Sequence, residues 1–227
     1  MAAATCGGGH VWRRPRRIGN PLPTAAAHTP VTTWVENPRG GRERGARGLA
    51  RAWVEVLVRP RRFFENGVAP GDQAPGLVFA IAMAVAYAVL LALLDPLRFP
   101  ATGALRAAVV VLLVAVLVAP AVLHLLAALQ TLTLMAVVRD RAGVSETVQV
   151  LAYATAPCPL AAVPSPELRV ACCLYGAALL VVGLVTVHRT TPGRAVLAAA
   201  LPAALLFGYG FGGFDALTTL LRAWYII

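Results

Sequence analysis

Three apolar runs stand one after another in the second half of this chain: residues 147–164 (TVQVLAYATAPCPLAAVP), 170–187 (VACCLYGAALLVVGLVTV) and 195–213 (AVLAAALPAALLFGYGFGG). Only the short polar linkers 165–169 and 188–194 separate them. A helix needs ~20 predominantly apolar residues to cross ~30 Å of hydrocarbon, and each run has about that length. The stretch therefore predicts a protein that crosses a membrane several times.

The first half of the chain adds two more apolar runs, residues 76–94 and 105–138. At ~1.5 Å per residue the second of these is roughly 50 Å long, too long for one vertical span. It is too short for two spans with a turn, and Pro120 near its middle has no Gly or Asn beside it, so we expect a kinked helix. The predicted fold is an all-α membrane domain, residues 75–213, with five transmembrane helices at about 76–94, 105–138, 147–164, 170–187 and 195–213, followed by a short tail at 214–227.

Composition agrees with a membrane protein. The chain is 59% hydrophobic and 13% charged, whereas soluble domains carry about 25% charged residues. The formal charge is +10, all of the basic residues are Arg, and they concentrate before Phe63. A nucleic-acid partner would need a basic face with aromatic or polar side chains that read bases. The sequence has no such face, so no nucleic-acid binding is expected.

Chemical motifs are missing from the sequence. Cys6, Cys158, Cys172 and Cys173 form no C-x-x-C pair, and the last three lie in apolar runs, where free Cys acts as a small hydrophobe. A disulfide or metal role is the minority alternative. The chain contains no H-E-x-x-H, G-x-S-x-G or phosphate-loop motif. We expect no catalytic, cofactor-binding or metal site.

Residues 49–64 predict an amphipathic helix ahead of the spans. Leu49, Trp53 and Val56 share one helical face, while Arg51 and Arg59 lie on another. Such a helix belongs at a membrane surface, here the anionic inner leaflet; the alternative is a helix packed on other helices. The expected membrane-surface contacts are Arg51, Trp53, Arg59, Arg61, Arg62, Phe63 and Phe64.

The N-terminal segment, residues 1–48, has the composition of a disordered basic tail. It combines an Arg cluster with Gly and Pro residues and has no apolar core for a signal peptide. The character of the sequence changes abruptly at Val31, and a valine codon can serve as a start. We expect translation to begin there, leaving residues 1–30 untranslated.

Four polar side chains inside the apolar runs form a candidate intramembrane cluster: His124, Gln130, Gln149 and Tyr153. Polar groups inside a span are functional candidates by default. The alternative for His124 is a neutral ring hydrogen-bonded to another helix. Pro157 and Pro159 predict that the outer half of the third run is irregular.

Two further patterns concern packing and orientation. Gly208 and Gly212 form a G-x-x-x-G pair, which predicts close helix packing. Arg clusters follow the second and fourth runs and precede the first, so a five-span chain places its N-terminus in the cytoplasm and its C-terminus outside. These features predict a multi-pass protein of the cell membrane.

Some motifs resemble a known family. The segment WVEVLVRP at 53–60 with Phe63 and Phe64, the residues Leu151, Tyr153, Ala154 and Pro157, and Gly183-Leu184 with His188 resemble archaeal Yip1-domain proteins, most of all haloarchaeal members. The resemblance covers roughly residues 31–213. It implies a five-helix membrane bundle with a cytosolic N-terminus. Eukaryotic members resemble adaptors of vesicle traffic that engage prenylated small GTPases, but the acidic Asp-Leu-Tyr-Gly-Pro-type motif is replaced here by Arg-rich sequence.

Two functions follow as hypotheses. The first is a non-enzymatic scaffold or adaptor that organises membrane or protein partners, lipids included, with self-association as a further option. The second is a small-solute or ion permease with a polar pocket around His124. The arrangement of the polar side chains distinguishes them: a permease needs them around a cavity, whereas a scaffold pairs them with the backbone of a dry bundle.

Overall fold

The computed structural model describes residues 45–225. The chain divides into two units, Met1–Pro30 and Val31–Ile227, and all of the described residues belong to the second. The expectations for the basic tail, including the start at Val31, fall outside the described residues except at positions 45–48. Every regular element between residues 45 and 225 is helical, in agreement with the predicted all-α class.

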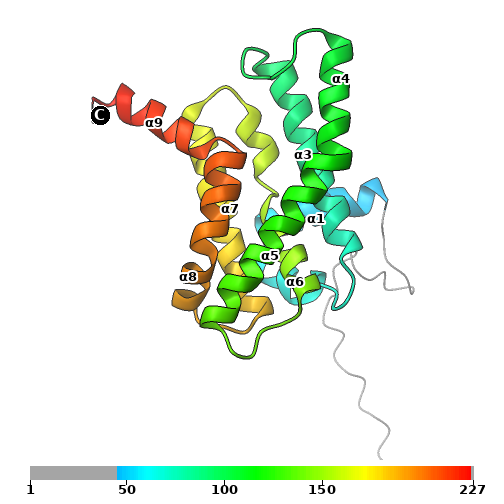
Figure 1. The fold of residues 1–227 in the computed structure, drawn as a ribbon, viewed down its shortest axis with the longest axis vertical. Coiled ribbons are helices and arrows are strands. Elements are labelled where there is room, and N and C mark those ends of the chain that lie inside the picture. The colour runs from blue at the N-terminus through cyan, green and yellow to red at the C-terminus, as the bar shows by residue number, and fades with distance from the viewer. Residues whose placement is uncertain (1–44, 226–227) are drawn as a thin grey trace, which may run out of the picture. The chain divides into compact units, whose positions relative to one another are not determined.

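Nine α-helices, two π-helical segments and one 3-10 helix make up the described part of the chain (Figure 1). The elements are α1 (Ala46–Val58), α2 (Pro60–Gly67), α3 (Ala74–Leu94), α4 (Ala104–Leu113), the π segment η1 (Val114–Val118), α5 (Ala119–Val137), α6 (Val144–Ala154), the 3-10 helix η2 (Cys158–Ala162), α7 (Pro166–Val187), α8 (Pro192–Ala203), the π segment η3 (Ala204–Gly210) and α9 (Gly213–Ala223).

Four helical stretches are long and apolar enough to cross a membrane: Ala74–Leu94, Ala104–Val137, Pro166–Val187 and Pro192–Gly210. The second is α4, η1 and α5 in one continuous helix, not a hairpin. Pro120 supplies no N–H and its ring crowds the carbonyl four residues earlier, and the helix changes to π geometry just before it, at Val114–Val118. The protein is therefore built as a multi-pass membrane protein.

The third apolar run of the sequence does not form a fifth long helix. α6 ends at Ala154, and the chain continues through a turn into η2. The α6 end of this central segment lies beside the start of α3, where Gly71 N–H donates to Ser145 Oγ (3.0 Å). Its η2 end lies beside the end of α3, because Arg169 contacts both Ala161 and Asp95. This central segment thus runs through the bundle from end to end.

Burial explains why the central segment is irregular. Every residue from 147 to 159 is buried, enclosed by α3, α5 and α7. Irregular backbone at membrane depth is tolerated only where protein covers it. The largest side chain of the segment, Tyr153, is fully buried among the rings of Phe63 and Phe79, with centroid distances of 4.8 and 5.1 Å. The core of the protein therefore forms around this segment.

Residues 49–64 belong to two helices. α1 ends at Val58, and Pro60 begins α2, where its missing N–H costs nothing at the first helical position. Both helices pack on the bundle: Ala52 and Val56 of α1 and Phe63 and Phe64 of α2 are buried. The apolar side of α1 and α2 therefore packs against other helices, which is the alternative considered above for residues 49–64.

The expected tail at 214–227 contains a further helix. α9 begins after Gly212, whose positive φ of 71° turns the chain away from η3. Arg98 Nη1 contacts Asp215 Oδ2 at 2.9 Å and thereby joins α9 to the loop after α3. Both side chains are substantially exposed, so this ion pair positions α9 with little contribution to the free energy of unfolding.

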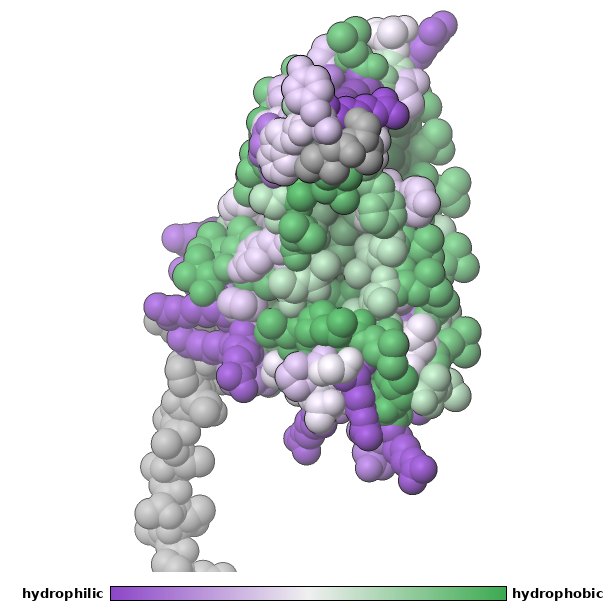
Figure 2. Space-filling view, turned by 90° about the vertical axis from the view of Figure 1, so that its left-hand side faces the viewer, coloured by the Kyte–Doolittle hydropathy of each residue, from purple (hydrophilic) through white to green (hydrophobic). Residues whose placement is uncertain are grey.

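The surface has the polarity expected of a membrane protein. Figure 2 shows apolar residues over the middle of one face and hydrophilic residues gathered at its lower end. Large apolar side chains of α4, η1 and α5 are exposed, including Leu105, Val116, Leu117 and Leu125. In water such a surface would aggregate; in hydrocarbon it contacts lipid.

Candidate functional site

The polar side chains of the bundle are directed to the protein's own backbone. The first case is the break between α6 and η2. Pro159 has no N–H, and Leu160 N–H donates to Pro157 O instead of Ala156 O. The carbonyl of Ala156 would be left unpaired, but Trp53 Nε1–H donates to it at 2.7 Å. An indole on α1 thus completes the hydrogen bonding of the central segment.

The second case lies in the outer half of the same segment. Ser165 N–H donates to Val163 O, so the helical partner of Ala161 O is missing. Arg169 Nε–H donates to Ala161 O at 2.8 Å, and Arg169 is only 3% exposed. Its Nη2 lies 3.9 Å from Asp95 Oδ2, which gives the buried guanidinium a counter-charge. Arg169 at the start of α7 therefore joins η2 to the end of α3.

The third case is the proline inside α8. Pro202 has no N–H to donate to Ala198 O, four residues earlier. Gln130 Nε2–H (2.9 Å) and Thr133 Oγ1–H (2.8 Å), both on α5, donate to that carbonyl. Gln130, an expected member of a polar cluster, is fully buried and serves as a link between α5 and α8.

The remaining members of the expected cluster lie elsewhere. Gln149 forms two hydrogen bonds with the backbone of Ala69, whose N–H donates to Oε1 (2.9 Å) and whose O accepts from Nε2 (2.7 Å). Tyr153 is enclosed by aromatic rings. His124 is exposed, and its Nδ1–H donates to Pro120 O of its own helix at 2.7 Å. The structure does not bring the four residues together around a cavity.

The expected membrane-surface residues divide into two groups. Arg51, Arg59 and Arg61 are exposed, and Arg62 is partly exposed. The aromatic members differ from the expectation: Phe63 and Phe64 are core residues that touch Tyr153, and Trp53 is partly buried by its bond to Ala156. Their apolar rings fill the bundle because α1 and α2 pack on it, so they do not reach headgroups.

The glycine pair also differs from the expectation. Gly212 lies in the turn before α9 with φ of 71°, so it does not share a helix face with Gly208. A Cβ on Gly208 would lie 2.3 Å from the ring of Phe214, so its role is to admit α9. Close helix approach occurs instead at Gly76, where a Cβ would lie 2.9 Å from Gln149 Cα, and at Gly176, where it would meet Phe207.

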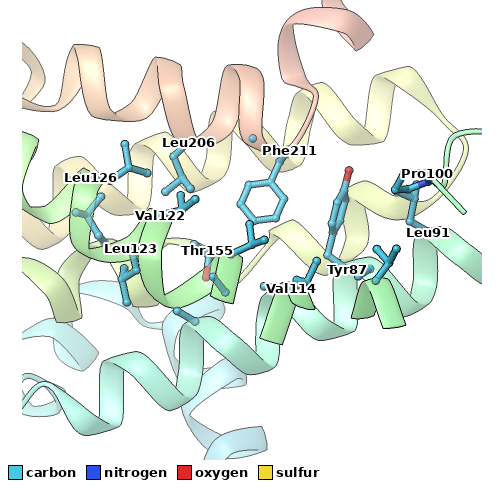
Figure 3. Close-up of a pocket in the computed structure, with 18 of the residues that line it drawn as sticks. Tyr87, Leu91, Pro100, Val114, Val122, Leu123, Leu126, Thr155, Leu206 and Phe211 are labelled. Atoms are coloured by element: carbon cyan, nitrogen blue, oxygen red, sulfur yellow. The ribbon is translucent and has the colours of Figure 1, made fainter. Parts of the chain in front are cut away.

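An apolar groove of about 300 Å³ lies between α3, the α4–α5 helix and η3. Figure 3 shows Tyr87, Pro100 and Leu91 at one end and Leu123 and Leu126 at the other. The rings of Tyr87 and Phe211 meet edge to face with centroids 5.1 Å apart. Among the polar lining atoms, Thr155 Oγ1–H already donates to Ala152 O at 2.7 Å.

Two π segments form walls of this groove. Val114 and Val118 come from η1, while Leu206 and Gly210 come from η3. Each π segment lies close to a proline, Pro120 or Pro202, and π segments occur frequently at functional sites. The groove is not predictable from the sequence pattern, because its lining consists of apolar residues on apolar helices; the two intrahelical prolines were the available signal.

This groove can accommodate an apolar chain. Its lining offers no charged side chain and no set of His, Cys or carboxylate ligands, and the described residues contain no group of three such side chains able to hold a metal. The apolar lining suits hydrocarbon and offers no path for an ion.

One protein family matches most of this bundle. The family model described as the Yip1 domain matches residues 54–214, which is more than half of the chain. The match covers α2 to η3 entirely, including both π segments and the central segment. Neither the curated proteins nor the solved structures contain a protein that matches the chain.

Proposed function

This chain belongs to the Yip1 domain family, and from that premise we propose that it is a non-enzymatic membrane scaffold or adaptor that organises lipids and protein partners. Family membership and four apolar helices make it a Yip1-like integral membrane protein. The scaffold role is the step beyond that, and it rests on how the bundle uses its polar groups.

The observation that carries the proposal is the pairing of polar side chains with backbone carbonyls. Trp53, Arg169 and Gln130 each donate to a carbonyl that a proline or a helix break leaves without its helical partner. The donor atoms committed in this way stabilise a particular packing and are not available to bind a solute. The permease alternative needs the same side chains around a cavity, and it has the weaker support.

Topology belongs to the proposal as well. Four long apolar helices can each cross the membrane, and the central segment of α6 and η2 runs through the bundle beside them. We count this segment as a further crossing, which gives five. Arg139 and Arg189 lie in the loops at one end, and an excess of Arg marks the cytoplasmic side. We place this end, together with the N-terminus and the arginines of α1 and α2, in the cytoplasm, and the C-terminus outside the cell membrane.

The test is in vivo crosslinking of the tagged full-length protein, with mass spectrometry of the captured proteins. The informative variant is Arg59→Gln with Arg61→Gln, two exposed arginines, the first at the junction of α1 and α2 and the second in α2. The matched control is Arg106→Gln with Arg222→Gln, two exposed arginines elsewhere on the molecule. If partners bind through Arg59 and Arg61, the wild type and the control variant are crosslinked to the same specific proteins. The Arg59→Gln, Arg61→Gln variant loses these partners.

A flux assay gives the opposing outcome. Wild-type protein and the His124→Ala variant are reconstituted in vesicles, and uptake of ions and small solutes is measured. Because His124 is exposed and bonds only to its own helix, the substitution leaves the fold intact. Solute uptake by the wild type that disappears in His124→Ala would establish the permease and overturn the scaffold.

A further inference from the structure

A second cavity lies at the loop end of the bundle, between the end of α5 and the start of α8. It encloses about 540 Å³ and is lined by residues 135–140 on one side and by Arg189, Thr190, Thr191 and Arg194 on the other. The two loops that form it lie together at the lower end of the bundle (Figure 1). Nothing in the scaffold role requires a cavity here.

The cavity carries an uncompensated positive charge. Arg139, Arg189 and Arg194 line it, and Asp140 is its single acidic residue. All four side chains are exposed, and none of them forms an ion pair with another residue of the described part of the chain. Arginines that only mark membrane orientation need no shared cavity. Arg139 comes from the loop after α5, Arg189 from the loop before α8 and Arg194 from the first turn of α8, yet all three line one cavity.

Backbone and hydroxyl donors accompany the arginines. α8 begins at Pro192, and its N-cap residue Thr191 makes no side-chain capping bond. The N–H groups of the first turn therefore lack the usual side-chain acceptor, and a Cβ added at Gly193 would meet nothing within 4 Å. Thr190 Oγ1 is buried at the same place with no hydrogen-bond partner, and Arg189 has an unusual positive φ of 49°.

The packing of α5 on α8 holds the two loops in position. Gln130 and Thr133 bind Ala198 O, which lies one turn beyond Arg194 on α8 and fixes the register of the two helices. Arg139 follows the end of α5, Arg194 lies in the first turn of α8, and both line the cavity. Arg194 thus lies on a packed helix, and Arg139 and Arg189 lie in loops directly next to packed helices.

We propose that this cavity binds a phosphate group through Arg139, Arg189, Arg194 and the N-terminus of α8. A guanidinium group donates two parallel hydrogen bonds to the oxygens of a phosphate. A helix N-terminus adds backbone N–H donors and a favourable dipole. The phosphate belongs either to the headgroup of a membrane lipid or to a small soluble molecule. This site does not depend on the scaffold role and stands if that role fails.

The experiment uses the full-length protein and two phosphate sources. In the first arm the protein is placed in bilayer discs of zwitterionic lipid with increasing phosphatidic acid, and retained lipid is counted by native mass spectrometry. In the second arm inorganic phosphate is titrated into the detergent-solubilised protein at constant ionic strength, and the melting temperature is recorded. Saturation in the first arm alone assigns the site to a lipid; saturation in the second shows that free phosphate suffices.

The variant that tests the residues is Arg139→Gln with Arg194→Gln, and the matched control is Arg106→Gln with Arg222→Gln. Removing two charged donors is expected to weaken binding by roughly tenfold or more, while the control binds as the wild type does. Arg194→Lys keeps the charge but loses the paired geometry, so it binds with intermediate affinity. Equal binding by the wild type, the double variant and the control, or no saturable binding in either arm, overturns the proposal.

Folding of the variants is checked by the melting temperature without phosphate. Arg139 and Arg194 are exposed and unpaired within the described residues, so both variants keep the wild-type value. If the double variant does not fold, the single variants Arg139→Gln and Arg194→Gln replace it. Each is then expected to bind more weakly than the control, and equal affinity overturns the assignment.

Discussion

Trp53 Nε1 donates a hydrogen bond to Ala156 O across 103 positions of sequence, at a distance of 2.7 Å. The bond joins α1 to the break in the central segment, where Pro159 removes a backbone donor. A buried carbonyl without a partner costs free energy, because in hydrocarbon no water replaces the missing donor. This relationship makes α1 part of the bundle and predicts a specific sensitivity at Trp53.

Replacing Trp53 with Phe is expected to lower the free energy of unfolding by about 1–3 kcal/mol, because an aromatic ring, although smaller, remains while the indole N–H is lost. The measurement is thermal unfolding of the detergent-solubilised protein. Trp224→Phe is the control, since Trp224 is exposed at the end of α9 and changes nothing in the core. Equal melting temperatures for the two variants would show that the bond to Ala156 contributes no stability.

Gly76 is expected to tolerate no side chain. A Cβ there would lie 2.9 Å from Gln149 Cα, and that backbone atom cannot move without shifting the central segment. Gly76→Ala therefore destabilises by about 1–3 kcal/mol through overpacking. Gly193→Ala is the control, because its Cβ would meet nothing within 4 Å, and Ala in a helix is favoured over Gly. Unfolding measurements in which Gly76→Ala is as stable as Gly193→Ala would refute the close contact.

The sequence predicts the elements of this protein better than their partners. Apolar length identifies the long helices, and Pro157 with Pro159 predicts the irregular half of the third run. The partner of Trp53 cannot be derived, because an indole on an amphipathic helix suits both a headgroup layer and a buried carbonyl. The same limit applies to Gln130. Its polarity is compatible with a functional site or with a hydrogen bond between helices, and only the position of Pro202 on the neighbouring α8 shows that it forms the hydrogen bond.

Gln130 and Thr133 are expected to depend on each other. Both donate to Ala198 O, so either one alone still satisfies that carbonyl. Gln130→Leu and Thr133→Val should each cost less than about 1 kcal/mol, whereas the double variant leaves the carbonyl unpaired. The double variant should lose roughly 1 kcal/mol more than the sum of the two.

The control for that pair uses a neighbouring threonine. Thr131 Oγ1–H donates to Ala127 O within its own helix, at 2.7 Å, and does not share a partner with Gln130. A cycle of Gln130→Leu with Thr131→Val should therefore be additive. Chemical or thermal unfolding of the two sets of variants makes the comparison, and equal coupling in both cycles contradicts the shared carbonyl.

His188 is buried at the end of α7 with one side of its ring unpaired. Thr147 Oγ1–H donates to Gly143 O, so His188 Nε2 must carry the proton in its 3.4 Å contact with Thr147. Its Nδ1 has no partner. Burial lowers the pKa of His188 from 6.5 to about 4; nearby Glu146 raises this pKa and Arg141 lowers it, but desolvation dominates.

The pKa of His188 predicts loss of stability in weak acid. The unfolded chain takes up the proton below about pH 6.5, whereas the folded protein excludes it until about pH 4. The contribution of His188 to the free energy of unfolding is therefore fully present above pH 6.5 and decreases as the pH drops toward 4. Below that pH it no longer changes, and the total loss is of the order of 3 kcal/mol. Unfolding measured across this range should show a smaller decline in His188→Gln. His124→Gln is the control and keeps the wild-type decline, because His124 is exposed; a decline equally steep in all three proteins would show that the burial of His188 is not its cause.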